Sequence, residues 1–160
     1  YSVHLVEYWT KTEVLQDFYK EMGKEGAVCF IAENPENDIV GFCWGYFVEI
    51  NESLEKHLGA NGLADSFKKR DINKSRFAYQ DEIAVLPEYQ GLGIAKKLFT
   101  ARHQHFKSVD PDGVVFFRTL SQPPSITYKW MVEKLGYDIV HTIEDSGRTK
   151  VIAAIQVSQV

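Results

Sequence analysis

The sequence contains little that would mark a secreted, membrane-spanning or nucleic-acid-binding protein. Two cysteines are too few for a disulfide framework, so a reducing, cytoplasmic setting is expected. No apolar run approaches the roughly 20 residues needed to cross a bilayer, and no signal peptide is visible. The formal net charge of −4 at pH 7 argues against nucleic acid as the main partner. These absences favour a globular protein with neither a nucleic-acid nor a membrane partner.

Internal repeats, low-complexity linkers and metal-binding patterns are also missing. The length of 160 residues suits one domain with a core of its own. His103 and His105 have strand-like spacing on a segment that is predicted to be helical, so their side chains diverge and make a poor metal pair. We therefore expect a single domain over residues 1–160, without a metal site.

Apolar periodicity predicts both helices and strands along the chain. Thr10 and Glu13 have capping-box spacing at the start of the first helix, whose apolar residues share one face: Leu15, Phe18, Tyr19 and Met22. The predicted order is a helix at 10–22, strands at 27–33 and 39–50, an insertion at 51–75, a strand at 76–86, a helix from 94, a strand at 113–120, a helix at 125–136, and strands at 137–144 and 149–157. This order predicts an α/β domain with a mixed sheet.

The insertion at 51–75 does not read as a hairpin loop. It contains two predicted short helices, at 51–58 and 63–71, separated by "GANG". A connection of this length between two strands is usually functional. We expect this helical insertion to roof the side where an acceptor substrate enters, and to act separately from cofactor binding.

A glycine-rich turn joins the apolar run Ile83 to Leu86 to the next predicted helix. It reads "PEYQGLG", and Gly91 and Gly93 allow a ligand to approach the main chain closely. The amides of a helix N-terminus bind anions, so a phosphate is the expected guest. A P-loop is excluded because no Gly-Lys-Ser/Thr follows four spacer residues. A dinucleotide fingerprint is excluded because Lys96 replaces its third glycine and the next strand has no acid at its end.

The motif over 90–95, "QGLGIA", resembles the acyl-coenzyme A signature of the GNAT superfamily of N-acetyltransferases. The preceding "DEIAV", Pro87 and the later "EKLGY" extend this resemblance, as does the order of elements from residue 10 onward. It implies a GNAT-like fold: a mixed, mostly antiparallel sheet with a splayed central parallel strand pair and helices on both faces. The family's usual first strand either falls within residues 1–9 or is lost.

The resemblance also implies which residues bind acetyl-CoA. Main-chain amides of the glycine turn hold the pyrophosphate, and Lys96 adds charge. The edge of the preceding strand pairs with the pantetheine arm, and the Val85 amide is placed to stabilise the oxyanion. Ser125 occupies the position of a family asparagine. The implied cofactor-binding set is Ile83, Ala84, Val85, Gln90, Gly91, Leu92, Gly93, Ile94, Ala95, Lys96 and Ser125.

Acetyl transfer to an amine needs a base, because a lysine-like amine has a pKa near ~10.4 and is protonated at neutral pH. Glu82 is the first candidate because family members frequently have an acid there, and Asp81 is the second. Strand alternation places the two on opposite faces unless a bulge intervenes. Glu49 and Glu52 are alternatives for recognising a cationic acceptor.

One departure from the family pattern concerns the general acid. The tyrosine that often protonates the departing thiolate falls at Val132 in this sequence. Tyr128 lies one helical turn earlier and is either a substitute acid or a packing aromatic.

Two functions follow from the sequence. The first is an acetyltransferase that moves an acetyl group from acetyl-CoA to a primary amine of a small molecule or peptide by direct attack in a ternary complex. The alternative is a non-catalytic acyl-CoA-binding module of the same fold, which the missing tyrosine favours. Either a monomer or a homodimer is compatible with the sequence.

Overall fold

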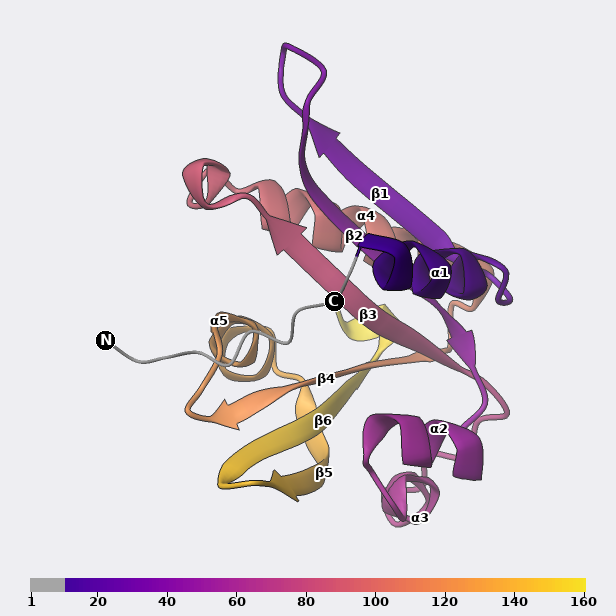
Figure 1. Cartoon of the computed structure of the whole chain (residues 1–160). Coiled ribbons are helices and arrows are strands. Elements are labelled where there is room, and N and C mark those ends of the chain that lie inside the picture. The colour runs from indigo at the N-terminus through magenta and orange to yellow at the C-terminus, as the bar shows by residue number, and fades with distance from the viewer. Residues whose placement is uncertain (1–10) are drawn as a thin grey trace.

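The computed structural model describes residues 11–160, which form one α/β domain around a six-stranded mixed sheet with the strand order β1-β2-β3-β4-β6-β5 (Figure 1). Thr10 and the strand expected within residues 1–9 lie outside the described part. The elements are α1 Lys11–Met22, β1 Val28–Glu33, β2 Ile39–Val48, α2 Glu52–Leu58, α3 Leu63–Lys68, β3 Phe77–Val85, α4 Ile94–Val109, β4 Val114–Gln122, α5 Ile126–Tyr128, a π-helical turn Lys129–Lys134, β5 Asp138–Asp145 and β6 Arg148–Gln156, with 3₁₀ turns at Pro87–Tyr89 and Val157–Gln159.

The central strands β3 and β4 run parallel but stay together over a short distance. Only Ala78 with Val115 and Tyr79 with Phe116 are paired, although each strand has 9 residues. The neighbouring pairs β1·β2, β2·β3, β4·β6 and β5·β6 are all antiparallel. The mixed, mostly antiparallel sheet with a splayed parallel pair is therefore confirmed.

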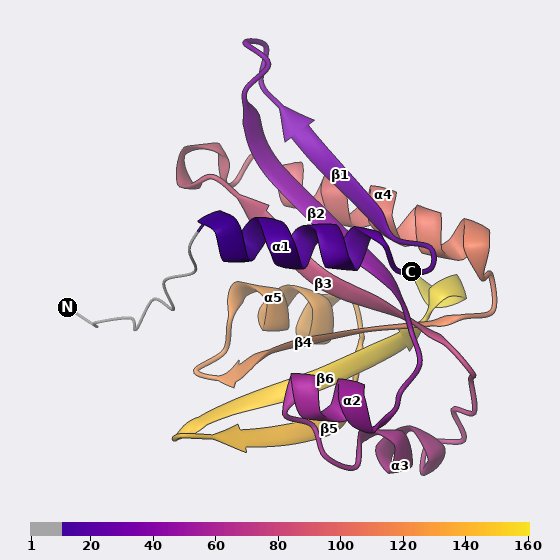
Figure 2. The ribbon, with the colours of Figure 1, turned by 45° about the vertical axis from the view of Figure 1, so that its right-hand side comes forward.

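Helices cover both faces of this sheet, as predicted. Figure 2 shows α1 on one side of β1 and β2, with α4 on the other. On the face covered by α1, α2 and α3 the buried cluster is Tyr46, Leu58, Ala60, Leu63, Phe67, Phe77, Tyr79, Val114, Phe116, Val140, Ile152 and Ala154. On the face covered by α4 and the π-helical turn it is Phe47, Ala78, Phe99, Phe106, Val115, Phe117, Met131, Tyr137, Ala153, Ile155 and Val157.

The segment 51–75 folds into α2 and α3 and belongs to the first of these clusters. Asn51 caps α2 by accepting a hydrogen bond from the Leu54 amide at 3.0 Å. Glu55 accepts from the amides of Gly62 at 3.1 Å and Ala64 at 2.8 Å, which fixes the start of α3 against α2. The Phe67 ring on α3 lies 4.6 Å from that of Phe77 and 6.0 Å from that of Phe116. The segment is thus a structural part of the core.

Helix α1 packs differently from the sequence-based expectation. Leu15 and Tyr19 of its predicted apolar face are 42% and 71% exposed. Phe18 makes the main contact, with its ring 5.4 Å from that of Trp44 on β2. The apolar stripe of α1 is wider than the narrow contact with β2 can bury, so only the side around Phe18 faces the sheet.

Candidate active site

A bulge in β3 determines where the two predicted acids lie. Trp44 pairs with Glu82, and the next residue of β2, Gly45, pairs with Gln80, so Asp81 is the extra residue. Tyr46 donates a hydrogen bond to Asp81 Oδ2 at 2.9 Å. Glu82 shares the face of its cross-strand partner Trp44, as opposite residues of antiparallel strands do. The bulge therefore brings both carboxylates to the face covered by α1, instead of to opposite faces as strict alternation would.

A buried arginine from α4 holds the bulge from the other face. Arg102 is only 2% exposed. Its Nη1 donates to the carbonyl oxygens of Trp44 and Glu82, both at 2.7 Å, and its Nη2 donates to Gln80 Oε1 at 3.2 Å. Gln80 Nε2 in turn donates to the Tyr137 hydroxyl at 3.1 Å. The sequence gave no sign of this role for Arg102.

Where β3 and β4 diverge, a cavity of about 160 Å³ opens between them. Arg102 and Met131 line it from the α4 side, and Arg118 of β4, which donates to the Leu58 carbonyl of α2, lines it from the opposite side. The cavity thus connects the two faces of the sheet. Its lining is Gln80, Asp81, Glu82, Ile83, Arg102, Phe117, Arg118, Thr119, Thr127 and Met131.

The electrostatics of this gap favour a carboxyl group that can take up a proton. The pKa of Glu82 is raised, first by burial and then by the charge of Asp81. The guanidinium groups of Arg102 and Arg118 act in the opposite direction. Glu82 keeps contact with solvent despite the surrounding protein. A carboxylate with a raised pKa that solvent can reach is suited to accept a proton from an amine.

The glycine turn between β3 and α4 forms one wall of a larger groove of about 840 Å³. Gly91 and Gly93 have φ of 78° and 79°, a left-handed conformation that side chains disfavour. No side chain caps the start of α4, so its first amides are available to a ligand. The lining is Ile83, Ala84, Val85, Tyr89, Gln90, Gly91, Gly93, Ile94, Ala95, Lys96, Ile126, Thr127, Trp130 and Lys134.

At the edge of β3, every second residue directs its main-chain amide and carbonyl toward this groove. The Leu86 amide donates to the Val40 carbonyl at 2.9 Å, so by alternation the amides of Ile83 and Val85 point away from β2. The Val85 carbonyl accepts a hydrogen bond from Gln90 Nε2 at 3.0 Å. An extended chain laid along this edge would meet main-chain donors and acceptors, as an added strand does.

Three predicted site residues, Leu92, Ser125 and Tyr128, line neither the gap nor the groove. Leu92 is exposed in the glycine turn. Ser125 caps α5: its Oγ accepts from the Tyr128 amide at 3.0 Å. Tyr128 is half-buried, and its neighbour Thr127 lines both cavities. The π-helical turn Lys129–Lys134 has a wider spacing than an α-helix, and within it Val132 packs against the core on the α4 face.

Glu21 of α1, a residue that was not among those predicted for the site, lies beside the bulge. Its carboxylate accepts from Trp44 Nε1 at 2.8 Å and from the Tyr46 hydroxyl at 3.4 Å. The pKa of Glu21 is raised to about 7. Burial is the main cause, followed by the charge of Asp81 and a hydrogen bond with Asp81. The spacing of three residues between Glu21 and Phe18, the α1 residue that packs on the sheet, was the available signal.

Glu21 also lines a cleft of about 350 Å³ between α1 and α2. Of the two residues proposed to recognise a cationic acceptor, Glu49 lines this cleft and Glu52 does not. Its lining is Asp17, Lys20, Glu21, Lys24, Val48, Glu49, Asn51, Ser53, Leu54 and His57.

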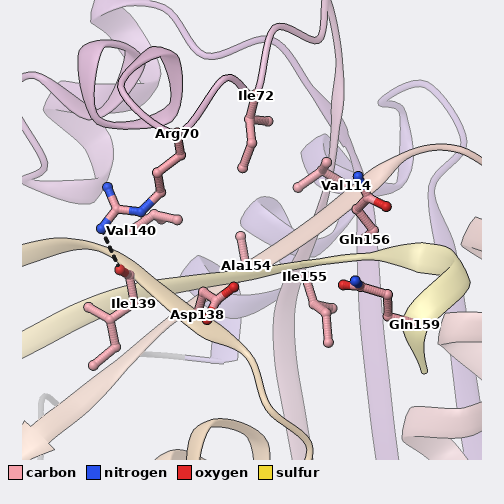
Figure 3. Close-up of a pocket in the computed structure, with 10 residues that line it drawn as sticks. All are labelled: Arg70, Ile72, Val114, Asp138, Ile139, Val140, Ala154, Ile155, Gln156 and Gln159. Atoms are coloured by element: carbon pink, nitrogen blue, oxygen red, sulfur yellow. Dashed lines mark hydrogen bonds between the residues drawn. The ribbon is translucent and has the colours of Figure 1, made fainter.

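A further cavity of about 440 Å³ lies at the opposite end of the parallel strands, where β4 begins at Val114 (Figure 3). Its arginine, Arg70, donates to the carbonyls of Ile139 at 2.8 Å and Ser66 at 3.2 Å. These bonds tie the end of α3 to β5, which is a structural role. Ligands of α/β sheets bind near the carboxyl ends of parallel strands, where the glycine turn lies, so this cavity is separate from the candidate site.

Within residues 11–160, no group of three or more His, Cys, Asp or Glu side chains is arranged to hold a metal ion. In the same part of the chain, no helix has the length and apolarity that crossing a membrane requires.

Comparison with known proteins agrees with this geometry. Residues 25–139 match the profile of the family described as "Acetyltransferase (GNAT) domain". No curated protein sequence gives a significant match to the chain.

Solved structures of the same fold include a mosquito arylalkylamine N-acetyltransferase like 5b, with a TM-score of 0.66, 12% identity, and coverage of 96% of this chain and 84% of that one. The Chaetomium thermophilum Naa20, in complex with a bisubstrate analogue, has a TM-score of 0.63 and 14% identity over 96% and 76% of the two chains. The ribosomal-protein-S18-alanine N-acetyltransferase of Escherichia coli has a TM-score of 0.62 and 14% identity over 94% and 78%. The fold, the splayed parallel pair and the match over residues 25–139 together show that the chain belongs to the GNAT acetyltransferase family.

Proposed function

We propose that this protein transfers an acetyl group from acetyl-CoA to a primary amine of a small molecule or peptide, by direct attack in a ternary complex. The observation that supports this most is the gap between β3 and β4. It connects the groove at the glycine turn with the face that holds Asp81 and Glu82. A thioester from one face and an amine from the other can meet there without a covalent enzyme intermediate.

The residues around the groove fit acetyl-CoA. The uncapped amides at the start of α4, with Gly91 and Gly93, suit the pyrophosphate, and Lys96 and Lys134 supply positive charge nearby. The β3 edge at Ile83 and Val85 suits the amides of the pantetheine arm. Two further residues remain in the proposed cofactor-binding set. Leu92 lies in the glycine turn between Gly91 and Gly93, and Ser125 caps α5.

The chemistry requires two protons to leave the amine. Glu82, or Asp81 as the second candidate, takes the first from the ammonium form, which frees the nitrogen lone pair. The nitrogen attacks the thioester carbonyl carbon, and the Val85 amide stabilises the resulting oxyanion. The C–S bond then breaks with its electron pair going to sulfur, and the nitrogen gives its second proton to water. The coenzyme A thiolate leaves as the anion, since a thiol has a pKa of about 8.5, or receives a proton from Tyr128 or water.

The acceptor is proposed to be a cationic amine that approaches from the face covered by α1 and α2. Asp81, Glu82 and Glu21 gather there, and Asp17 and Glu49 line the adjacent cleft. Carboxylates favour a positively charged partner. The names of the similar structures, which refer to an arylalkylamine and to a protein alanine, are compatible with this class but do not specify the acceptor.

Two measurements on the purified protein test the proposal. Calorimetry should detect acetyl-CoA binding, and a thiol reagent should report coenzyme A release across a panel of alkylamines, polyamines and short peptides. Glu82→Gln should leave the acetyl-CoA dissociation constant nearly unchanged while turnover falls by about 10²-fold or more. Glu36→Gln, the same change at the exposed tip of the β1–β2 hairpin, is the matched control and should have no effect.

The other outcomes separate the alternatives. Acetyl-CoA binding without turnover on any amine would favour the non-catalytic acyl-CoA-binding module. Retained activity in Glu82→Gln together with loss in Asp81→Asn would assign the base to Asp81. Failure to bind acetyl-CoA at all would refute the assignment of the groove.

A further inference from the structure

The bulge at Asp81 interrupts the regular ladder between β2 and β3. An extra residue in one strand disrupts the hydrogen bonds around it and bends the strand. A main-chain carbonyl oxygen has two lone pairs, so a side chain can donate to it beside the ladder. At this bulge such a donor comes from a helix on the far face of the sheet.

That donor is Arg102, whose guanidinium holds both strands at the bulge. One nitrogen, Nη1, binds the Trp44 carbonyl of β2 and the Glu82 carbonyl of β3, each at 2.7 Å. These are charge-assisted bonds of short length, which are stronger than bonds between neutral groups. Nη2 binds Gln80 Oε1 at 3.2 Å, on the other side of Asp81 in sequence. The guanidinium therefore contacts the chain both before and after the bulged residue.

Arg102 has this position without a carboxylate partner of its own. No carboxylate of the described residues forms a salt bridge with it, although it is only 2% exposed. A buried charge is costly unless it is well hydrogen-bonded, so carbonyl contacts alone are an unusual arrangement. The negative charges of Asp81 and Glu82 act on it through space.

The opposite strand makes room for this side chain. A Cβ at Gly45 would lie 2.4 Å from the Tyr79 carbonyl oxygen, 2.8 Å from the Phe106 ring and 3.4 Å from Arg102 Cδ. Only glycine fits between the bulge and α4 here. The arginine and the glycine that faces it thus form one packing arrangement around the bulge.

We propose that Arg102 is a positioning residue of the acetyl-transfer site: by binding the carbonyls of Trp44 and Glu82 it fixes the bulge, and so fixes where the carboxylates of Asp81 and Glu82 stand in the gap. This inference rests on the proposed function, because it assigns Arg102 to the placement of the proposed base. Arg102 touches neither substrate in this role and acts through the β3 main chain.

The charge of Arg102 has a second, separable consequence. The groups facing Glu82 are Asp81 of β3, Tyr79 of β3, Arg118 of β4 and Arg102 of α4, with Glu21 of α1 behind Asp81. Among these, Arg102 and Arg118 lower the pKa of Glu82. Removing the Arg102 charge should raise that pKa, so the base would become protonated at a higher pH.

Two substitutions separate the position of the carboxylates from the charge. Arg102→Lys keeps a cation but has one nitrogen in place of the two that bind the three acceptors, so it cannot hold the same geometry. The kcat should therefore fall by about 10²-fold, the scale of a misplacement of about 1 Å, while the acidic limb of the pH profile stays at the same pH. Arg102→Gln removes the charge as well, so kcat should fall at least as far and the acidic limb of kcat/KM should move to higher pH. The acetyl-CoA dissociation constant should change little in both.

Tyr137→Phe is the matched control. It removes the hydroxyl that receives a hydrogen bond from Gln80 but leaves the hydrogen-bond partners of Arg102 in place. It should lower the melting temperature without changing the pH profile, which is the behaviour of a purely structural residue.

The outcomes separate this proposal from the function it rests on. If the wild type turns over no amine, the proposed function fails first. If the wild type is active and folded Arg102 variants keep both kcat and the pH profile, the positioning role is wrong. If neither Arg102 variant folds while Tyr137→Phe does, Arg102 serves stability and the proposal is overturned. A loss of kcat in folded variants, with a shifted acidic limb in Arg102→Gln alone, supports it.

Discussion

Two connections that leave β3 and its neighbour β2 differ in almost every physical respect. The turn from β3 to α4 keeps its side chains outside the core, and Leu92 is 68% exposed. It contains two glycines with positive φ and ends at a helix start that no side chain caps. The connection from β2 to β3 instead buries Leu58, Leu63 and Phe67 completely and satisfies its helix starts with Asn51 and Glu55.

The difference teaches how to tell a binding turn from a structural insertion. A turn that binds a ligand leaves main-chain donors unpaired and has few side chains near them, which lowers the stability of the fold. An insertion that closes the core instead pairs its main-chain donors and buries its side chains. The segment 51–75 both borders the cleft between α1 and α2 and supports the sheet, so the same helices serve the cleft and the core.

The largest expected effect comes from breaking the packing of the insertion. Phe67→Ala removes a ring that packs against Phe77 and Phe116, so it should lower the free energy of unfolding by about 3–5 kcal/mol. Leu92→Ala, in the exposed turn, should change it by less than about 0.5 kcal/mol. Urea unfolding followed by fluorescence measures both. Similar losses in the two variants would contradict the contrast between the connections.

The next effect concerns the conformation of the turn. Gly93→Val introduces a branched side chain at φ of 79°, which costs roughly 1–2 kcal/mol of stability in the left-handed region. The side chain also occupies the space next to the first amides of α4. We expect acetyl-CoA affinity, measured by calorimetry, to fall by about tenfold or more, equal to about 1.4 kcal/mol.

Gly147→Val is the matched control for this change. Gly147 has φ of 81° in the hairpin between β5 and β6, far along the chain from the groove. It should lose a similar amount of stability and keep its acetyl-CoA affinity. An equal loss of affinity in both variants would mean that strain, and not the place of Gly93, explains the effect.

The parts of the molecule that could be predicted from sequence are those with local causes. Apolar runs predicted β1 to β6 within a few residues. The residues "DSG" at 145–147 are typical of a hairpin turn, and Ser146 and Gly147 there have φ of 49° and 81°. The glycine turn was recognisable because positive φ restricts the residue type. The splay of β3 and β4 came from family resemblance, since no local pattern encodes it.

The features that could not be predicted depend on contacts between distant residues. The bulge at Asp81 is stabilised by Arg102, 21 positions later, and by the missing side chain at Gly45. Glu21 reaches the site because Phe18 fixes the rotation of α1. The π-helical turn Lys129–Lys134 changes the faces of the residues within it, and Val132 does not line the gap. Helical and strand periodicity predicts which residues of an element share one face. The bulge, the rotation of α1 and the π-helical turn each change which residues share it.

The smallest expected effect tests whether a fall in pH destabilises the insertion at 51–75 but not the glycine turn. Ser66 Oγ of α3 lies 2.8 Å from His141 Nδ1 of β5, which ties the insertion to the sheet. Burial lowers the pKa of His141, and the charge of Glu55 opposes this only in part. Because the folded pKa lies below the unfolded value of ~6.5, the contribution of His141 is complete above that pH and is lost as the pH falls through it.

The consequence can be isolated with His141→Gln, which cannot titrate. The wild type should lose a few tenths of a kcal/mol of stability relative to this variant between about pH 8 and pH 5, a small amount because the ring is only partly buried and solvent screens its charge. Protection from hydrogen exchange, corrected for the intrinsic pH dependence of exchange, should fall over this range in α3 and β5 of the wild type, because the Ser66–His141 contact joins them. The start of α4 should show no such fall, since its amides take no part in that contact. A stability difference that is constant with pH, or protection that falls equally in α4, would show that protonation of His141 does not act through the insertion.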